Sequence, residues 1–176
     1  TGSTYTLGLM ERIPPTHDDC IIDNGSNSFL DMSHYLNNKT LSSLTDKRHA
    51  LIIHTVVTGG QALYDTINGF SQLISQIPNK ALFVVWLNPF FGPVEDQGKG
   101  FEQMKAYKDN QDRITALISI PALNKDMFGR DLTDMLSERL IFDEAIANPS
   151  RFIITRQRLT MIRRQLFEQI DKAVVV

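Results

Sequence analysis

The sequence predicts an α/β fold of three layers, in which helices cover both faces of a mostly parallel sheet. Two observations support this class: short apolar runs alternate with helical patterns, and these runs are continuously apolar. Parallel strands that are buried on both faces have this composition, and strands that alternate with helices form right-handed crossovers. With 176 residues, 42% of them hydrophobic, the chain can bury one sizeable core. We therefore expect a single α/β domain over residues 1–176.

Four runs are expected to form the strands. All are short, rich in β-branched or aromatic residues, and bounded by turn residues. In chain order they are Cys20–Asp23, Ala50–Val56, Ala81–Asn88 and Ile114–Ile120.

Helical patterns lie between and after these runs. A short helix is expected at Phe29–Leu36. A longer one follows Thr58–Gly60 and ends at Pro78, because its apolar residues recur at spacings of three and four. They are Leu63, Ile67, Phe70, Ile74 and Ile77. Two further helices are expected within 129–140 and 155–173. The last has an apolar stripe, expected to face the sheet, formed by Leu159, Ile162, Leu166 and Ile170.

The segment Asn88–Glu102 is rich in glycine and proline and is too long for a simple connection. Loops at the carboxyl ends of strands often carry function. We therefore expect this segment to contribute to the functional site.

Charge and composition exclude several classes of protein. A formal net charge of -2 and a pI near 6.0 give no bulk attraction to nucleic acid or to anionic membranes. No apolar run approaches the length of about 18 residues that a membrane-spanning helix needs, so a cytoplasmic protein is expected. The single cysteine, Cys20, excludes an intramolecular disulfide.

The arginines of the last helix leave direct DNA contact open. They are Arg151, Arg156, Arg158, Arg163 and Arg164. A solvated face is favoured over a phosphate-binding patch, because helical projection places Arg158 on the flank opposite Arg156, Arg163 and Arg164.

Metal and nucleophile motifs are weak. The histidines show no paired spacing typical of zinc sites, and His54, inside a strand, is expected to be a core residue. The backbone N–H groups of Thr58–Gly60 suit an anion at a helix start, although the glycines also suit a tight turn.

Three strand ends are expected to meet at one edge of the sheet, where α/β proteins bind ligands. Asp23 ends the first run, and its carboxylate suits the water shell of Mg²⁺. Asn88 ends the third run; its amide suits the edge of a purine base, and equally a turn before Pro89.

Several stretches together resemble one protein family. They include "CIIDNGSNSFLDMSHYL", "IIHTVVTGGQALYDTINGF" and "VVWLNPFFGPVEDQGKGFEQMKAYKDN". The chain is similar to the carboxyl-terminal two thirds of MinD/ParA/CobQ-type P-loop ATPases, above all to members from conjugative plasmids linked to transfer or stable inheritance. The resemblance implies a P-loop NTPase-like fold that is incomplete at its N-terminus, and a homodimer.

The resemblance also implies roles for individual residues. Asp23 would be the catalytic switch aspartate, near Mg²⁺ through water, and Gly25 would let that segment move. Asn88 and Pro89 would contact the adenine, and Pro121 would lie beside the base.

The sequence departs from the family pattern in one feature that determines whether ATPase activity is expected. The glycine-rich phosphate loop is absent, and the chain begins at Thr1 without methionine, so we expect a fragment or a natural truncation. ATP and Mg²⁺ would belong to the complete parent protein; this chain alone is expected to bind neither tightly and to be inactive as an ATPase.

Two functions follow. The chain is part of a nucleotide-binding ATPase of plasmid conjugal transfer or partition, with transfer or partition proteins as partners. Alternatively, it is a non-catalytic α/β protein-interaction module.

Overall fold

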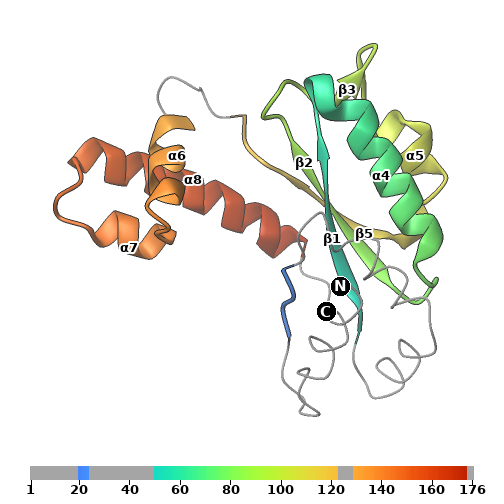
Figure 1. Ribbon diagram of the computed structural model, residues 1–176, viewed down its shortest axis with the longest axis horizontal. Helices are drawn as coiled ribbons and strands as arrows, with labels where there is room; N and C mark the ends of the chain where they lie inside the picture. The colour runs from blue at the N-terminus through green and yellow to red at the C-terminus, as the bar shows by residue number, and fades with distance from the viewer. Residues whose placement is uncertain (1–19, 24–49, 123–128, 174–176) are drawn as a thin grey trace, which may run out of the picture.

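The computed structural model describes residues 20–23, 50–122 and 129–173 (Figure 1). Its centre is a three-stranded parallel sheet with the order β1-β2-β5. The strands are β1 (Ile52–Thr58), β2 (Leu82–Asn88) and β5 (Ile114–Ser119). This confirms the α/β class and three of the four expected strands.

Helix α4 (Leu63–Gln76) covers one face of the sheet, and the short α5 (Lys105–Lys108) lies beside it (Figure 1). The expected apolar stripe of α4 is confirmed, because Phe70 and Ile74 are buried in the main core. On the sheet side this core contains Val57, Phe83 and Val85. Three single-turn helices complete this half: η2 (Gly60–Ala62), η3 (Phe101–Gln103) and η4 (Gln111–Arg113).

Arg113 ties the start of β5 to the end of α4. Its guanidinium donates hydrogen bonds of 2.5, 3.1 and 2.8 Å to the carbonyl oxygens of Ile74, Ile77 and Pro78. Its charged group also lies over the ring of Phe83, 5.0 Å from the ring centre. A cation at this place satisfies the carbonyl of Ile74 in the last turn of α4 and those of Ile77 and Pro78 just past the helix.

Three helices lie on the other side of the sheet from α4 and α5 (Figure 1). They are α6 (Arg130–Ser137), α7 (Phe142–Ala147) and α8 (Ile153–Lys172). They share a second core, in which Leu159 and Ile162 of α8 pack with Met135 of α6 and Ala145 of α7. The stripe of α8 therefore faces α6 and α7. Helix α8 also contacts β5, so the expectation that its stripe faces the sheet fails for Leu159 and Ile162 and not for the helix as a whole. Periodicity shows which side of a helix is buried but not what buries it.

The segment after β2 is more ordered than its composition suggests. It contains a two-stranded antiparallel hairpin, β3 (Glu95–Asp96) and β4 (Lys99–Gly100). Gln97 and Gly98 connect the strands with φ of 50° and 76°. Two positive φ values match the twist of a two-residue hairpin turn, and glycine adopts them without steric cost.

A strand and a helix were expected in the N-terminal part of the chain. Cys20–Asp23 is not a strand, and Ile21 is 96% exposed. The expectation was wrong because an apolar run of so few residues fits a strand and an exposed loop equally well. The expected helix Phe29–Leu36 lies outside the described residues.

Within the described ranges, every helix is too short or too polar to cross a bilayer.

Candidate functional site

The carboxyl ends of the three strands meet at one edge of the sheet, as the parallel arrangement predicts. Thr58, at the end of β1, lies directly beside Asn88, at the end of β2. The N–H of Ile120, just past β5, donates a 2.9 Å hydrogen bond to the carbonyl oxygen of Leu87. Pro121 follows and is half-buried.

The two glycines after β1 allow its backbone to lie close to the backbone of the loop after β2. The N–H of Gly59 donates to the carbonyl oxygen of Asn88 at 2.9 Å, and that of Gly60 donates to the carbonyl oxygen of Pro93 at 3.3 Å. A Cβ atom on Gly59 would lie 2.2 Å from the carbonyl oxygen of Gly92. Both N–H groups are therefore used by the neighbouring loop. The sequence left two interpretations of this segment, an anion-binding site and a tight turn, and the structure supports the tight turn.

Asn88 also takes part in this loop. Its side-chain Oδ1 accepts a 3.1 Å hydrogen bond from the N–H of Phe90, and the N–H of Gly92 donates to the carbonyl oxygen of Pro89 at 3.1 Å. Such a side-chain bond two residues along the chain is an Asx turn. Asn88 therefore acts as a turn residue in this structure. Contact of Asn88 and Pro89 with a base stays a prediction.

The loop Asn88–Pro93, called the aromatic loop below, exposes two phenylalanines. Phe90 is 59% exposed and Phe91 is 49% exposed. Their rings meet edge to face, with centres 4.9 Å apart and planes at 81°. Aromatic side chains held apart from the core are characteristic of protein interfaces, whose binding energy concentrates in such residues. Sequence reasoning marked this segment but not its phenylalanines.

The remaining predicted site residues are not brought to this edge. Asp23 lies in an exposed segment outside the sheet, because Cys20–Asp23 is not a strand. Gly25 lies outside the described residues. In the described part of the chain, no three His, Cys, Asp or Glu side chains gather as metal ligands. The catalytic and magnesium roles of Asp23 stay predictions.

His54 is exposed, in contrast to the core position expected for it. Its Nδ1 accepts a 2.9 Å hydrogen bond from Nε1 of Trp86 on the neighbouring strand β2. Because Nδ1 accepts, the neutral imidazole carries its proton on Nε2. Burial of part of the ring lowers the pKa of His54 below its usual value of 6.5.

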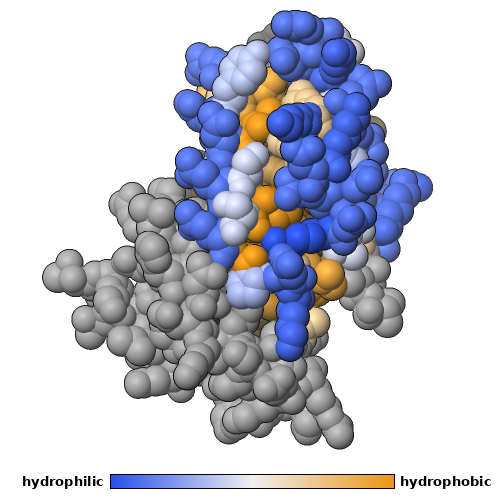
Figure 2. Space-filling view, turned by 90° about the vertical axis from the view of Figure 1, so that its right-hand side faces the viewer, coloured by the Kyte–Doolittle hydropathy of each residue, from blue (hydrophilic) through white to orange (hydrophobic). Residues whose placement is uncertain are grey.

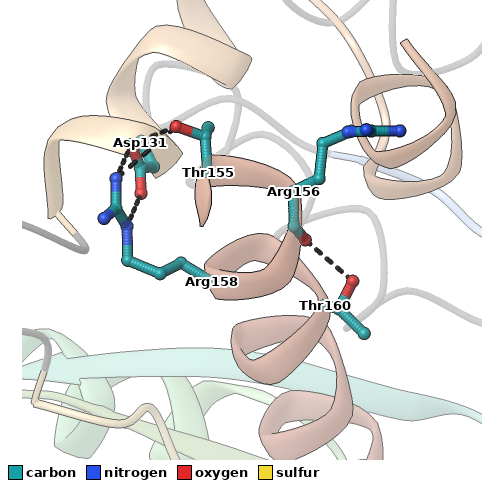
Figure 3. Close-up of polar contacts among 5 residues, drawn as sticks. All are labelled: Asp131, Thr155, Arg156, Arg158 and Thr160. Carbon is teal, nitrogen blue, oxygen red and sulfur yellow. Dashed lines mark hydrogen bonds and ion pairs between the residues drawn. The ribbon is translucent and has the colours of Figure 1, made fainter. Parts of the chain in front are cut away.

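The arginines of α8, and Arg151 just before it, are mostly paired with acids. Arg158 makes a two-point contact with the buried Asp131 of α6, and Figure 3 shows Arg156 on the opposite side of the helix, as predicted. The hydrogen bond to Asp131 raises the pKa of Arg158. The other ion pairs are Arg151–Glu138, Arg163–Asp143 and Arg164–Glu168. This pattern favours a structural role over a phosphate-binding patch; direct DNA contact stays untested.

Comparison with known proteins gives two close relatives from Escherichia coli, both called Protein TraL. One is 58% identical and the other 53% identical over 169 residues. The match covers 96% of this chain and 70% of each relative. No protein-family model matches the chain, and no solved structure matches it.

These relatives correct the family assigned from sequence. Relatives with more than half of their residues identical are TraL proteins, so the assignment to the MinD/ParA/CobQ-type ATPases is wrong. That resemblance rested on stretches of sequence around predicted strands and turns, and an α/β fold does not determine a function.

Proposed function

The chain belongs to the TraL family, and on that premise we propose that it acts in plasmid conjugal transfer as a protein-interaction module. The family supports transfer over partition as the process. The module's contact point is the aromatic loop, and its partner is another protein of the transfer machinery. The expected compartment is the cytoplasm.

The observation that carries this proposal is the pair of exposed phenylalanines on a braced loop. Phe90 and Phe91 leave about half of their surface in water. Covering that surface with a partner would contribute about 1–2 kcal/mol for each ring. Adjacent exposed apolar side chains indicate an interaction site more strongly than single ones do, and the two rings in contact form such a pair.

The bracing supports a preformed contact. Gly59 and Gly60 hold the loop through backbone hydrogen bonds, and Asn88 closes its turn with its own side chain. A loop fixed before binding loses little conformational freedom when the partner arrives, and this favours affinity.

The same contacts weigh against a nucleotide at this edge. The two N–H groups that would receive a phosphate already donate to the loop, and Oδ1 of Asn88 is already an acceptor. A nucleotide would have to displace these bonds. We therefore expect this chain alone to bind ATP and Mg²⁺ weakly, and we propose the interaction module in preference to catalysis.

A mating experiment tests the proposed process. The gene is deleted from a self-transmissible plasmid that carries it and is supplied again in the donor cell. Deletion should lower the frequency of transfer to recipients, and resupply should restore it. Plasmid retention in unmated donors is the control, because a partition defect would lower retention. Normal transfer together with lowered retention would contradict the proposal.

The partner protein is to be identified by crosslinking from the aromatic loop. A second copy of the chain is the alternative partner. Sedimentation of the purified chain measures that association directly and separates it from contact with another transfer protein.

A further inference from the structure

A groove with an apolar floor lies beside α4, on the face that Figure 2 shows. Figure 2 shows a hydrophobic strip there between hydrophilic walls. The groove has a volume of about 310 Å³. The lining residues that matter here are Tyr64 and Ile67 of α4, Asp96 and Lys99 of the hairpin, and Met104 and Lys105 at the start of α5.

The floor of the groove is well packed because its side chains contact the main core. Ile67 and Met104 are half-buried and pack against the buried residues under α4. Such a floor accepts an apolar side chain without a large rearrangement.

The walls carry an excess of positive charge. Lys99 and Lys105 are exposed, and within the described part of the chain neither forms a salt bridge. The one carboxylate on the lining, Asp96, accepts a 2.8 Å hydrogen bond from the hydroxyl of Tyr64, and this bond raises the pKa of Tyr64. The carboxylate thus already has a partner, while both ammonium groups remain available to a ligand.

We propose that this groove binds an acidic segment of a partner protein. An apolar side chain of that segment lies on Ile67 and Met104, and its carboxylates meet Lys99 and Lys105. The apolar floor distinguishes this ligand from a nucleic-acid backbone, which offers phosphates but no aliphatic side chain. The groove shares no residue with the aromatic loop, so this proposal stands whether or not the loop contact does.

A peptide titration tests the groove. The probe is a capped hexapeptide of alternating glutamate and leucine, added to the isotopically labelled full chain and followed by amide chemical shifts. Saturable shifts are expected at Met104 and Lys105. The matched peptide with glutamine in place of glutamate should bind about tenfold more weakly, as should the first peptide at high salt, because exposed charges are screened.

Charge reversal on the protein provides the second arm. The double variant Lys99→Glu/Lys105→Glu should weaken binding about tenfold, through two lost attractions and two new repulsions. The control Lys80→Glu/Lys172→Glu makes the same change of net charge at two exposed lysines outside the groove, and it should leave affinity within about twofold.

Three results would overturn the proposal. They are the absence of saturable shifts, equal affinity for the glutamine peptide, and equal weakening by the control variant. Stronger shifts of the same amides with duplex DNA would assign the groove to nucleic acid instead. The amide spectrum of each variant shows whether it is folded; if the double reversal unfolds the chain, Lys99→Gln and Lys105→Gln replace it.

Discussion

The backbone N–H of Gly59 donates a 2.9 Å hydrogen bond to the carbonyl oxygen of Asn88, which joins the turn after β1 to the loop after β2. This bond continues the pairing of the two strands beyond their ends, where Thr58 lies beside Asn88. The edge that sequence reasoning assigned to a nucleotide is therefore a place where two backbone segments pack together. The part of this edge that is exposed to solvent is the aromatic loop.

Replacing Gly59 with alanine should destabilise the fold. The new Cβ would lie 2.2 Å from the carbonyl oxygen of Gly92 and 2.3 Å from that of Pro93, and backbone atoms cannot move aside cheaply. We expect a loss of about 1–3 kcal/mol in the free energy of unfolding, measured by urea denaturation.

Gly69→Ala is the matched control. Gly69 lies within α4, and a Cβ there would meet no atom within 4 Å. Alanine is the better helix former, so this variant should gain about 1 kcal/mol. Equal effects of the two alanines would show that the close approach at Gly59 carries no energetic weight.

Removing the Arg158 side chain should destabilise the packing of α6 against α8. Arg158→Met would leave the carboxylate of Asp131, which is only 7% exposed, without its cationic partner. The urea midpoint should fall clearly, whereas it should hardly change in Arg164→Met, whose pair with Glu168 is exposed. The double variant Asp131→Leu/Arg158→Met should recover most of the loss. A midpoint in Arg158→Met equal to that of Arg164→Met would contradict the assignment.

His54 should make stability depend on pH. Its pKa is lowered in the folded chain by burial, whereas the unfolded chain has the usual value of 6.5. Between these two pKa values the unfolded chain binds more protons, so stability should fall as the pH drops below 6.5. Protonation of Nδ1 would also end the hydrogen bond from Trp86.

Nuclear magnetic resonance can follow both partners of this pair. The ring signals of His54 and the indole N–H of Trp86, the single tryptophan, should titrate together with a midpoint below 6.5. His54→Phe should remove the step from the indole signal. A midpoint at or above 6.5 would show that burial does not favour the neutral ring.

MgATP should leave the thermal midpoint of this chain unchanged. A ligand that binds only the folded state stabilises it once its concentration exceeds the dissociation constant, so a rise of the midpoint would report nucleotide bound at any site of the folded chain. A midpoint that rises with MgATP concentration, and that no longer rises in Asn88→Ala, would restore the nucleotide interpretation of the sheet edge.

Particular elements show what could be predicted from sequence. Ala81–Asn88 reads as a strand because a buried parallel strand is apolar throughout, and helix α4 is visible in its spacing. The stripe of α8 could also be recognised, but its packing partners could not, since they come from distant elements. Asp131 and Arg158 are 27 residues apart, and no local pattern links them.

The candidate site shows the same division. The meeting of Thr58 and Asn88 follows from parallel topology, which the alternation of strands with helices predicts. Phe90 and Phe91 are exposed on a loop whose backbone is held by Gly59 and Gly60 of another loop, and no local pattern in the sequence links these two segments. From sequence alone, two adjacent phenylalanines are expected to be buried, so their exposure could be recognised only in the structure.

The most direct test of the central claim is the mating frequency of donors that carry Phe90→Ser/Phe91→Ser. The control is Leu136→Ser/Met161→Ser, which removes two apolar side chains, 60% and 53% exposed, on the separate helices α6 and α8. Immunoblotting verifies equal amounts of each protein. We predict that the loop variant lowers transfer about tenfold or more, because it removes the apolar contact with the partner, while the control retains nearly normal transfer. Normal transfer by the loop variant at normal abundance would contradict the proposal that the aromatic loop is the contact through which this chain acts.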